Sequence, residues 1–291
     1  MTLLGNAARC VLLFALVTAL PAFAAGTAAG IRGLFAACGF SLALHLALAV
    51  FGPPFILRAC RARALSKDEA PEAHALLYEM GACLRVSLPR LFLVAAPEPF
   101  IFRLGFPGNT ALVISAGLLK ELCAEEFQAL IAHELAHCRR GDVWPATQAA
   151  LPAAALGALA ALLRALLGFG SGRPQAGHDK ASGHPLGEIA AWVLHALAGM
   201  LIRLGAAPGR EYAADQLAGK FCGNPLYLAG ALRKLDAAAA AKNFSQIPQM
   251  CTHLLAVPVR VTAAKKPVFK THPDTEERMV RLEKMARESG L

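Results

Sequence analysis

His133-Glu134-Leu135-Ala136-His137 is the stretch that decides the fold of this 291-residue chain. Two histidines four residues apart on a helix lie one above the other, because 3.6 residues make a turn. A single Zn²⁺ can bridge two imidazole nitrogens at that span, and Glu134 can reach the open side of the metal without becoming a ligand. There its carboxylate could deprotonate a water molecule. Good helix formers with acidic residues in the first turn precede the motif at 124–130, which supports a helix.

The motif has an alternative reading as an amphipathic helix with two surface histidines and a solvated glutamate. A five-residue pattern recurs by chance, so it needs a third ligand further along the chain. Further along the chain, Glu211 and Asp215 are also four residues apart and share a helix face, so this segment can supply the third ligand. Glu211 can be the third protein ligand, and Asp215 can accept a hydrogen bond from the outward nitrogen of a zinc-bound histidine. Each could instead be an exposed helix acid, but the upstream motif outweighs that alternative.

The composition indicates a membrane protein. Hydrophobic residues make up 56% and charged residues 17% of the chain, and the mean hydropathy is +0.47, beyond the usual range of water-soluble domains. The net charge of +9 comes from basic residues that are scattered or flank apolar blocks. We therefore expect a lipid bilayer as a partner and no nucleic acid. The eight cysteines form no CxxC pair, which favours a reducing compartment over a disulfide framework or a cysteine zinc site.

Four apolar runs are candidates for membrane helices: 10–25, 34–52, 143–168 and 189–202. The first ends in Pro21-Ala22-Phe23-Ala24-Ala25, which also resembles a signal-peptide cleavage site, and we favour an uncleaved anchor. The third and fourth form a hydrophobic hairpin of undecided depth, because the fourth has only fourteen residues and could be re-entrant or interfacial.

Basic residues place the main part of the chain in the cytoplasm. Arg58, Arg61, Arg63 and Lys67 follow the second run, whereas the loop before it offers only Arg32. By the positive-inside rule, the chain after the second run stays on the cytoplasmic side. We expect an integral protein of the bacterial inner (cytoplasmic) membrane with its catalytic domain in the cytoplasm.

The remaining sequence predicts a small mixed domain. Helical spacing covers 68–84, strand patterns cover 91–95, 100–102 and 111–115, and a short helix covers 117–122. An edge strand of this sheet could pair with an extended peptide substrate. Near the end, Asp274 or Thr275 caps a last helix. The expected organisation is a membrane region at 1–57, a first half of the catalytic domain at 58–142, the hairpin at 143–208 and a second half at 209–291.

Four elements in order resemble the HtpX and CaaX-prenyl-protease type of integral-membrane zinc metallopeptidase, over about residues 68 to 288. They are the strand and helix entry 111–122, the 133–137 motif followed by Asp142, the segment 211–215, and His272-Pro273 with Arg278. The resemblance implies an α+β, mainly α fold: a zincin-like (gluzincin) catalytic domain with a small β-sheet and about four hydrophobic membrane-associated helices.

The resemblance also implies site roles. His133, His137 and Glu211 would be ligands of one zinc ion per chain, Glu134 the general base, and Asp215 the partner of a zinc-bound histidine. It places His272 and Arg278 in a motif near the site, with substrate positioning and helix capping both open as roles. The chain departs from the family at 99–103, where Pro-Phe-Ile-Phe-Arg replaces an Asn-Ala-Phe element. That departure bears on the substrate strand and leaves the zinc chemistry unchanged.

The expected activity is that of a membrane-bound zinc metalloendopeptidase. It would hydrolyse peptide bonds of membrane or membrane-associated proteins at the cytoplasmic face, as part of protein quality control. The first alternative is a sensor-type metallopeptidase that cleaves a dedicated regulator, which an appended regulator-binding region would favour. The second is a non-enzymatic membrane scaffold, which an eroded 133–137 motif or a missing Glu211 would favour. Prenyl-protein processing is a further family activity, but the chain is short and has few apolar runs for an enclosed chamber.

Overall fold

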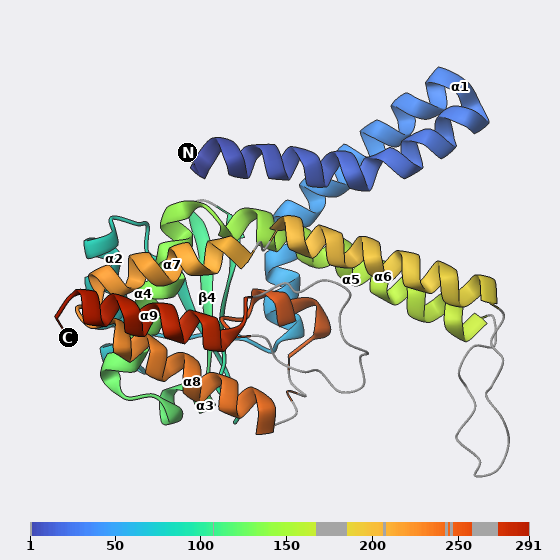
Figure 1. Ribbon diagram of the computed structural model, residues 1–291. Coiled ribbons are helices and arrows are strands. Elements are labelled where there is room, and N and C mark those ends of the chain that lie inside the picture. Colours follow the sequence, from blue (N-terminus) through green and yellow to red (C-terminus); the bar gives the residue numbers. More distant parts are fainter. Residues whose placement is uncertain are drawn as a thin grey trace, which may run out of the picture.

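A sheet-containing body and a set of long apolar helices that project from it make up the structure (Figure 1), which is a computed structural model. It describes residues 2–106, 108–166, 185–205, 208–241, 244, 247–257 and 273–290. The loop histidines 178 and 184, the family-motif residue His272 and the basic residues at 265–270 lie outside the described residues.

A four-stranded mixed sheet lies at the centre of the body. Its strands are β1 (Arg63–Ala64), β2 (Arg90–Val94), β3 (Ile101–Phe106) and β4 (Asn109–Ser115), in the order β1-β2-β4-β3. β2 runs parallel to β4, and the other two pairs are antiparallel. β3 and β4 form a hairpin in which Gly108 has a φ of +80°, a conformation that glycine adopts without strain. The two-residue β1 was not predicted, and β3 continues four residues beyond the predicted 100–102, because pairing with β4 extends it.

The sheet is buried on both faces. Alternate residues of a strand point to opposite faces, so Ile101, Leu112 and Ile114 enter one apolar cluster. Phe102, Leu104 and Val113 enter the other. The first cluster contains the buried face of α4 (Ala124–Arg140) together with α2 (Pro71–Leu84), α8 (Pro225–Ala241) and α9 (Thr275–Glu288). The second contains α5 residues and the 3₁₀ helix η1 (Gln249–Leu254). Two further helices complete the body: α3 (Ala116–Glu121) and α7 (Pro208–Phe221).

Capping residues set the ends of α4 and α9. The backbone N–H of Cys123 donates to Glu126 Oε2 over 3.0 Å at the start of α4, and Gly141, with a φ of 70°, ends it in the left-handed conformation typical of helix termini. At α9 the cap is Asp274, whose side chain accepts from the Glu276 N–H over 3.2 Å. The sequence had left Asp274 and Thr275 as alternatives.

Three long helices carry the apolar runs. α1 (Thr2–Ala59) joins the first two runs and is kinked at Ala29–Gly30, where Gly30 has a φ of 62°. α5 (Val143–Leu166) and α6 (Pro185–Gly205) lie side by side and extend away from the body (Figure 1). Buried alanines on both helices, including Ala149 and Ala191, allow this close approach. The fourth run therefore lies in a longer helix than its apolar residues alone suggested: 21 residues, which at about 1.5 Å each can span a bilayer.

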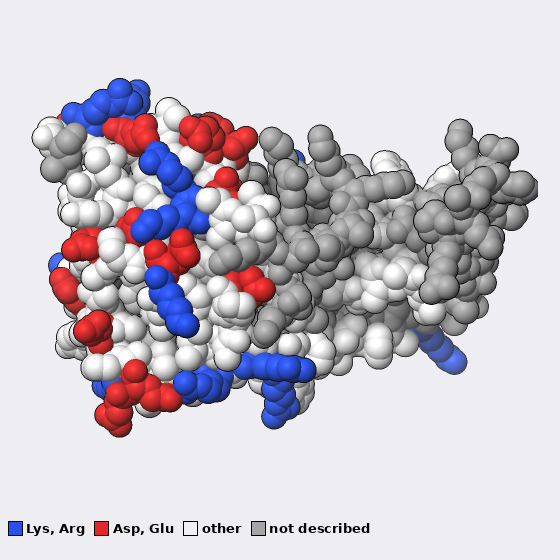
Figure 2. Space-filling view, turned by 90° about the horizontal axis from the view of Figure 1, so that it is seen from below, with Lys and Arg blue, Asp and Glu red and all other residues white. Residues whose placement is uncertain are grey.

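Length and composition qualify Pro21–Ala59, Val143–Leu163 and Ile189–Phe221 as membrane spans among the described residues. The last range reaches into α7, whose charged residues Arg210 and Glu211 belong outside the hydrocarbon layer, so α6 is the spanning part. Figure 2 shows the complementary distribution of charge. Lys, Arg, Asp and Glu are interspersed with uncharged residues over the body, whereas the described part of the projecting end shows mostly uncharged atoms and a basic side chain. The long apolar helices are those of a membrane protein.

Candidate metal centre

The helix α4 buries the whole 133–137 motif. His133, Glu134 and His137 are each 0% exposed, because this face of α4 packs against the sheet and α7. The two imidazole rings have centroids 4.9 Å apart, with an angle of 81° between their planes. The spacing of four residues thus places both rings on the same side of the helix, as predicted.

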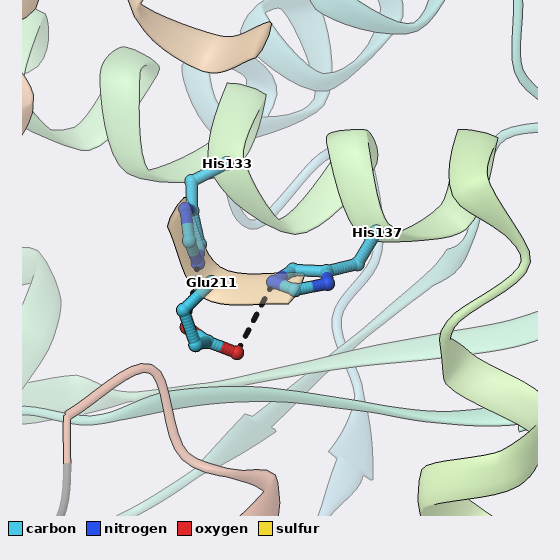
Figure 3. Close-up of side chains that lie close together, drawn as sticks. All are labelled: His133, His137 and Glu211. Atoms are coloured by element: carbon cyan, nitrogen blue, oxygen red, sulfur yellow. Dashed lines mark ion pairs between the residues drawn. The ribbon is translucent and has the colours of Figure 1, made fainter. Parts of the chain in front are cut away.

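Glu211 on α7 completes a group of three (Figure 3). Its Oε2 lies 3.4 Å from His133 Nε2, and its Oε1 lies 3.4 Å from His137 Nε2. One possible ligand atom from each of the three residues lies within 4.8 Å of the others. Tetrahedral zinc with bonds of about 2.0–2.1 Å holds neighbouring ligand atoms about 3.4 Å apart. The nitrogen–oxygen spacings therefore match those of a zinc site before any ion is considered.

The centre contains buried polar atoms without hydrogen-bond partners. They include His137 Nε2, Glu134 Oε1 and Glu211 Oε2. A buried polar atom without a partner is costly, and a cation can satisfy several such acceptors at once. Two neutral imidazoles and a carboxylate are a common ligand set of zinc enzymes and leave a fourth position open. Within the described residues, this trio is the group able to hold a metal ion.

Two aspartates lie beside the two histidines. Asp215 Oδ1 is 2.9 Å from Nδ1 of His133, and Asp142 Oδ2 is 3.3 Å from Nδ1 of His137. Such carboxylates orient a ligand histidine so that its Nε2 faces the metal. Burial would lower the pKa of His133, but Asp215 and Glu211 outweigh it and raise that pKa to about 9. Metal binding at neutral pH therefore displaces a proton from this site.

Sequence reasoning had assigned the Asp215 contact but had no role for Asp142. The left-handed Gly141 turns the chain at the end of α4, and the Asp142 N–H donates to His137 O over 3.0 Å. This turn brings the Asp142 carboxylate back to the imidazole. The Gly-Asp pair four residues after His137 was the available signal. Arg210 and Arg140 also contact Asp142, at 3.4 and 3.0 Å.

The charges around Asp142 keep it ionised. Burial would raise its pKa, but the hydrogen bond and charge of His137, followed by Arg210 and Arg140, lower it to about 2. Arg210 Nη2 also donates to Asn6 Oδ1 over 2.9 Å, which ties the start of α1 to the centre. Burial lowers the pKa of Arg210 to about 10, against the opposing effect of Asp142.

Arg278, for which the sequence left substrate positioning and helix capping open, joins three elements. It is 1% exposed and donates to both carboxylate oxygens of Asp215, each over 2.8 Å. Its Nη1 donates to Ala256 O over 2.7 Å and lies 3.4 Å from Glu211 Oε2. Burial opposes the charge, yet Asp215 and Glu211 raise the pKa of Arg278 further. Arg278 thus links α9 to α7 and to the segment after η1.

Arg103 on β3 also reaches the centre. Its Nη1 donates to Glu134 Oε2 over 2.7 Å, and its Nη2 lies 3.8 Å from Glu211 Oε1. Burial would lower its pKa, but Glu134 and Glu211 raise it. The sequence marked Arg103 only as part of the departure at 99–103, because its partner lies 31 residues away on another element.

Comparisons with known proteins agree with this geometry. The family model of peptidase family M48 matches residues 67–286. A protease HtpX homolog of Syntrophobacter fumaroxidans is 31% identical over 283 residues, covering 97% of this chain and 100% of the relative. A protease HtpX homolog of Pyrococcus abyssi is 32% identical over 290 residues, 99% of each chain. A further one from Burkholderia ambifaria is 31% identical over 286 residues, covering 97% and 98%.

Proposed function

The chain belongs to peptidase family M48, and from this premise we propose that it is a membrane-bound zinc endopeptidase that hydrolyses peptide bonds of membrane or membrane-associated proteins. The observation that carries the proposal is the pair of 3.4 Å distances from the Glu211 carboxylate to His133 Nε2 and His137 Nε2. These distances fit one zinc ion in a buried, otherwise unsatisfied site.

Each residue of the centre has a proposed role. His133, His137 and Glu211 hold one zinc ion, while Asp142 and Asp215 orient the two imidazoles. When bound, zinc supplies a Lewis acid that polarises the peptide carbonyl and makes a water molecule more acidic. Glu134 takes the proton from the attacking water and later delivers it to the leaving amine. Its position one residue after His133 keeps the carboxylate beside the ligands.

The proposed address is the cytoplasmic face of the bacterial inner membrane. α1, α5 and α6 would lie in the bilayer, and the basic residues that follow α1 would remain in the cytoplasm. Asp142, beside His137, directly precedes the first residue of α5. This adjacency supports catalysis close to the bilayer surface, where membrane proteins would present exposed segments.

The exposed thiols Cys83 and Cys123 allow the orientation to be tested. A membrane-impermeant maleimide added to intact spheroplasts should leave both unlabelled and should label them after the membrane is permeabilised. The Cys83→Ser/Cys123→Ser variant identifies the signal of these two residues. Labelling of Cys83 and Cys123 in intact spheroplasts would contradict the cytoplasmic address.

The activity itself is tested with Glu134→Gln, which keeps the side-chain volume and removes the base. We expect the purified variant to retain one zinc per chain and to lose casein cleavage by at least about a hundredfold. Full activity would refute the mechanism. Quantitative proteomics of membranes carrying wild-type protein or this variant then identifies substrates. Many misfolded membrane proteins would support quality control, and a single accumulating protein would support cleavage of a dedicated regulator.

A further inference from the structure

Arg103 is a buried cation that the proposed roles leave without a function. It is 7% exposed, and its Nε is buried without a hydrogen-bond partner. Arg103 lies on the same face of β3 as Ile101, and Ile101 enters the apolar cluster around α4. The residue opposite in β4 is Leu112, also in that cluster. An apolar side chain would suit this position better than a guanidinium, since burying a charge is costly.

The main chain of Arg103 faces the outer side of the edge strand β3. β3 is an edge strand, and backbone groups of alternate residues in a strand point to the same side. The neighbours Ile101 and Gly105 use that side for bonds within the protein. Ile101 O accepts from Ala256 N over 3.2 Å, and Gly105 N donates to Thr147 Oγ1 over 3.0 Å. Leu255 also forms an isolated antiparallel bridge with Phe102, so the segment after η1 lies along this side of β3 next to Arg103.

The guanidinium itself lies beside the candidate metal ligands and the proposed base. Arg103 lines one small cavity together with His137 and Glu211, and its Nη1 is 2.7 Å from the Glu134 carboxylate. From this geometry we propose that Arg103 is a catalytic residue that donates a hydrogen bond to the acyl oxygen of the scissile peptide as negative charge develops there. The inference rests on the proposed peptidase function and adds a residue to it.

The movement of charge during hydrolysis explains why Arg103 would change partner. As the water oxygen bonds to the acyl carbon, its proton passes to Glu134, and the electron pair of the C=O double bond moves onto the acyl oxygen. Glu134 becomes neutral and attracts Arg103 less, while the acyl oxygen becomes the new anion beside it. When the C–N bond breaks, the C=O bond re-forms and Glu134 gives its proton to the amine. The carboxylate of Glu134 is then restored and pairs with Arg103 again.

Kinetics of three variants test this role on fluorescence-quenched casein. Arg103→Met removes the donors and keeps an unbranched side chain, and Arg103→Lys keeps a charge without the planar fork. Arg90→Met is the matched control, because Arg90 is an exposed arginine on strand β2 of the same sheet and pairs with Asn109. We expect Arg103→Met to lower kcat about 100- to 1000-fold with little change in KM. Arg103→Lys should lose less, and bound zinc should equal that of the wild type in all three.

Binding of a phosphinic peptide separates a contact with the acyl oxygen from an effect through Glu134. The peptide has the sequence around the casein bond that the wild type cleaves fastest, with a tetrahedral phosphinate in place of that bond. The affinity is measured by calorimetry in the Glu134→Gln background, with and without Arg103→Met. A loss of at least about tenfold on adding Arg103→Met supports the contact, because the carboxylate is already absent. Equal affinities overturn it.

The outcomes keep the two proposals apart. A wild-type protein that is zinc-loaded yet leaves casein intact contradicts the peptidase function itself. An active wild type with Arg103→Met equal to Arg90→Met overturns only the role of Arg103. Loss of zinc or a lowered melting temperature in Arg103→Met, with normal kcat per bound zinc, also overturns it and leaves a structural role.

Discussion

Replacing Arg278 by Met should strongly destabilise the protein while leaving the proposed zinc ligands in place. Arg278 is 1% exposed and holds the buried Asp215 through two hydrogen bonds of 2.8 Å. The substitution leaves that carboxylate and the carbonyl of Ala256 without this partner. Removing one member of a buried ion pair costs about 3–5 kcal/mol. At about 2–4 °C per kcal/mol for a domain of this size, we expect the melting temperature to fall by about 6–20 °C.

Scanning fluorimetry in detergent with a zinc chelator present measures this effect without the contribution of bound metal. The matched control is Arg281→Met, one turn further along α9, because Arg281 is 56% exposed and pairs with the exposed Glu277. Exposed pairs contribute about 0.2–1 kcal/mol, so the control should melt within about 4 °C of the wild type. Equal melting temperatures for the two variants would refute the assignment of Arg278 as the residue that holds α7, α9 and the segment after η1 together.

Three further predictions concern the metal and its neighbours. His137→Ala should remove bound zinc, measured by elemental analysis of the purified protein, and stoichiometric zinc would count against it as a ligand. Asp142→Asn should weaken zinc binding about 10- to 100-fold in competition with a chelator, and an unchanged affinity would show that the aspartate does not orient His137. The folded-state pKa of Asp142 is lowered to about 2 from 3.8, so its carboxylate stabilises the fold above pH 3.8 and this contribution is lost as the pH falls through about 2. This contribution amounts to about 2 kcal/mol. The melting temperature of the metal-free wild type should therefore fall more between pH 5 and 2.5 than that of Asp142→Asn. Equal falls in the two proteins would contradict a contribution from the Asp142 carboxylate.

Much of the metal centre could be predicted because its elements are local. The spacing of four between His133 and His137, and between Glu211 and Asp215, becomes a shared face on any helix. Helix formers and acidic first-turn residues marked α4, and short apolar runs next to turn residues marked the cores of β2, β3 and β4. The sequence indicated that the helix of Glu211 meets the helix of His133 only because the 133–137 motif lacked a third ligand, which Glu211 could supply.

The contacts that could not be predicted join residues without a fixed spacing. Arg103 meets Glu134 because β3 takes the edge position and turns alternate side chains toward α4. Asp142 returns to His137 because Gly141 adopts a left-handed turn. Arg278 reaches Asp215 from another helix, 63 residues away. The separation of the two residues in each pair follows no helix or strand repeat, so these contacts could not be inferred from spacing along the chain.

The membrane part shows the same division. Apolar runs of sufficient length were visible in the sequence, since the thickness of a bilayer sets how many residues must be apolar. The two arms of α1 fold back on each other at Ala29–Gly30, so that the rings of Phe14 and His45 lie 4.8 Å apart, and α5 and α6 pack side by side; both arrangements depend on tertiary contacts.

By itself, the sequence determined the ligand types, their helical spacing and the apolar segments, because each follows from the geometry of one helix or from the thickness of the bilayer. Only the tertiary structure decided that Glu211 lies 3.4 Å from both His133 and His137, and that Arg103 shares the centre with Glu134. The physical reason is that such distances depend on strand order and helix packing. Strand order and helix packing are set by the burial of whole faces of the helices and the sheet, and the spacing of a few residues does not reveal them.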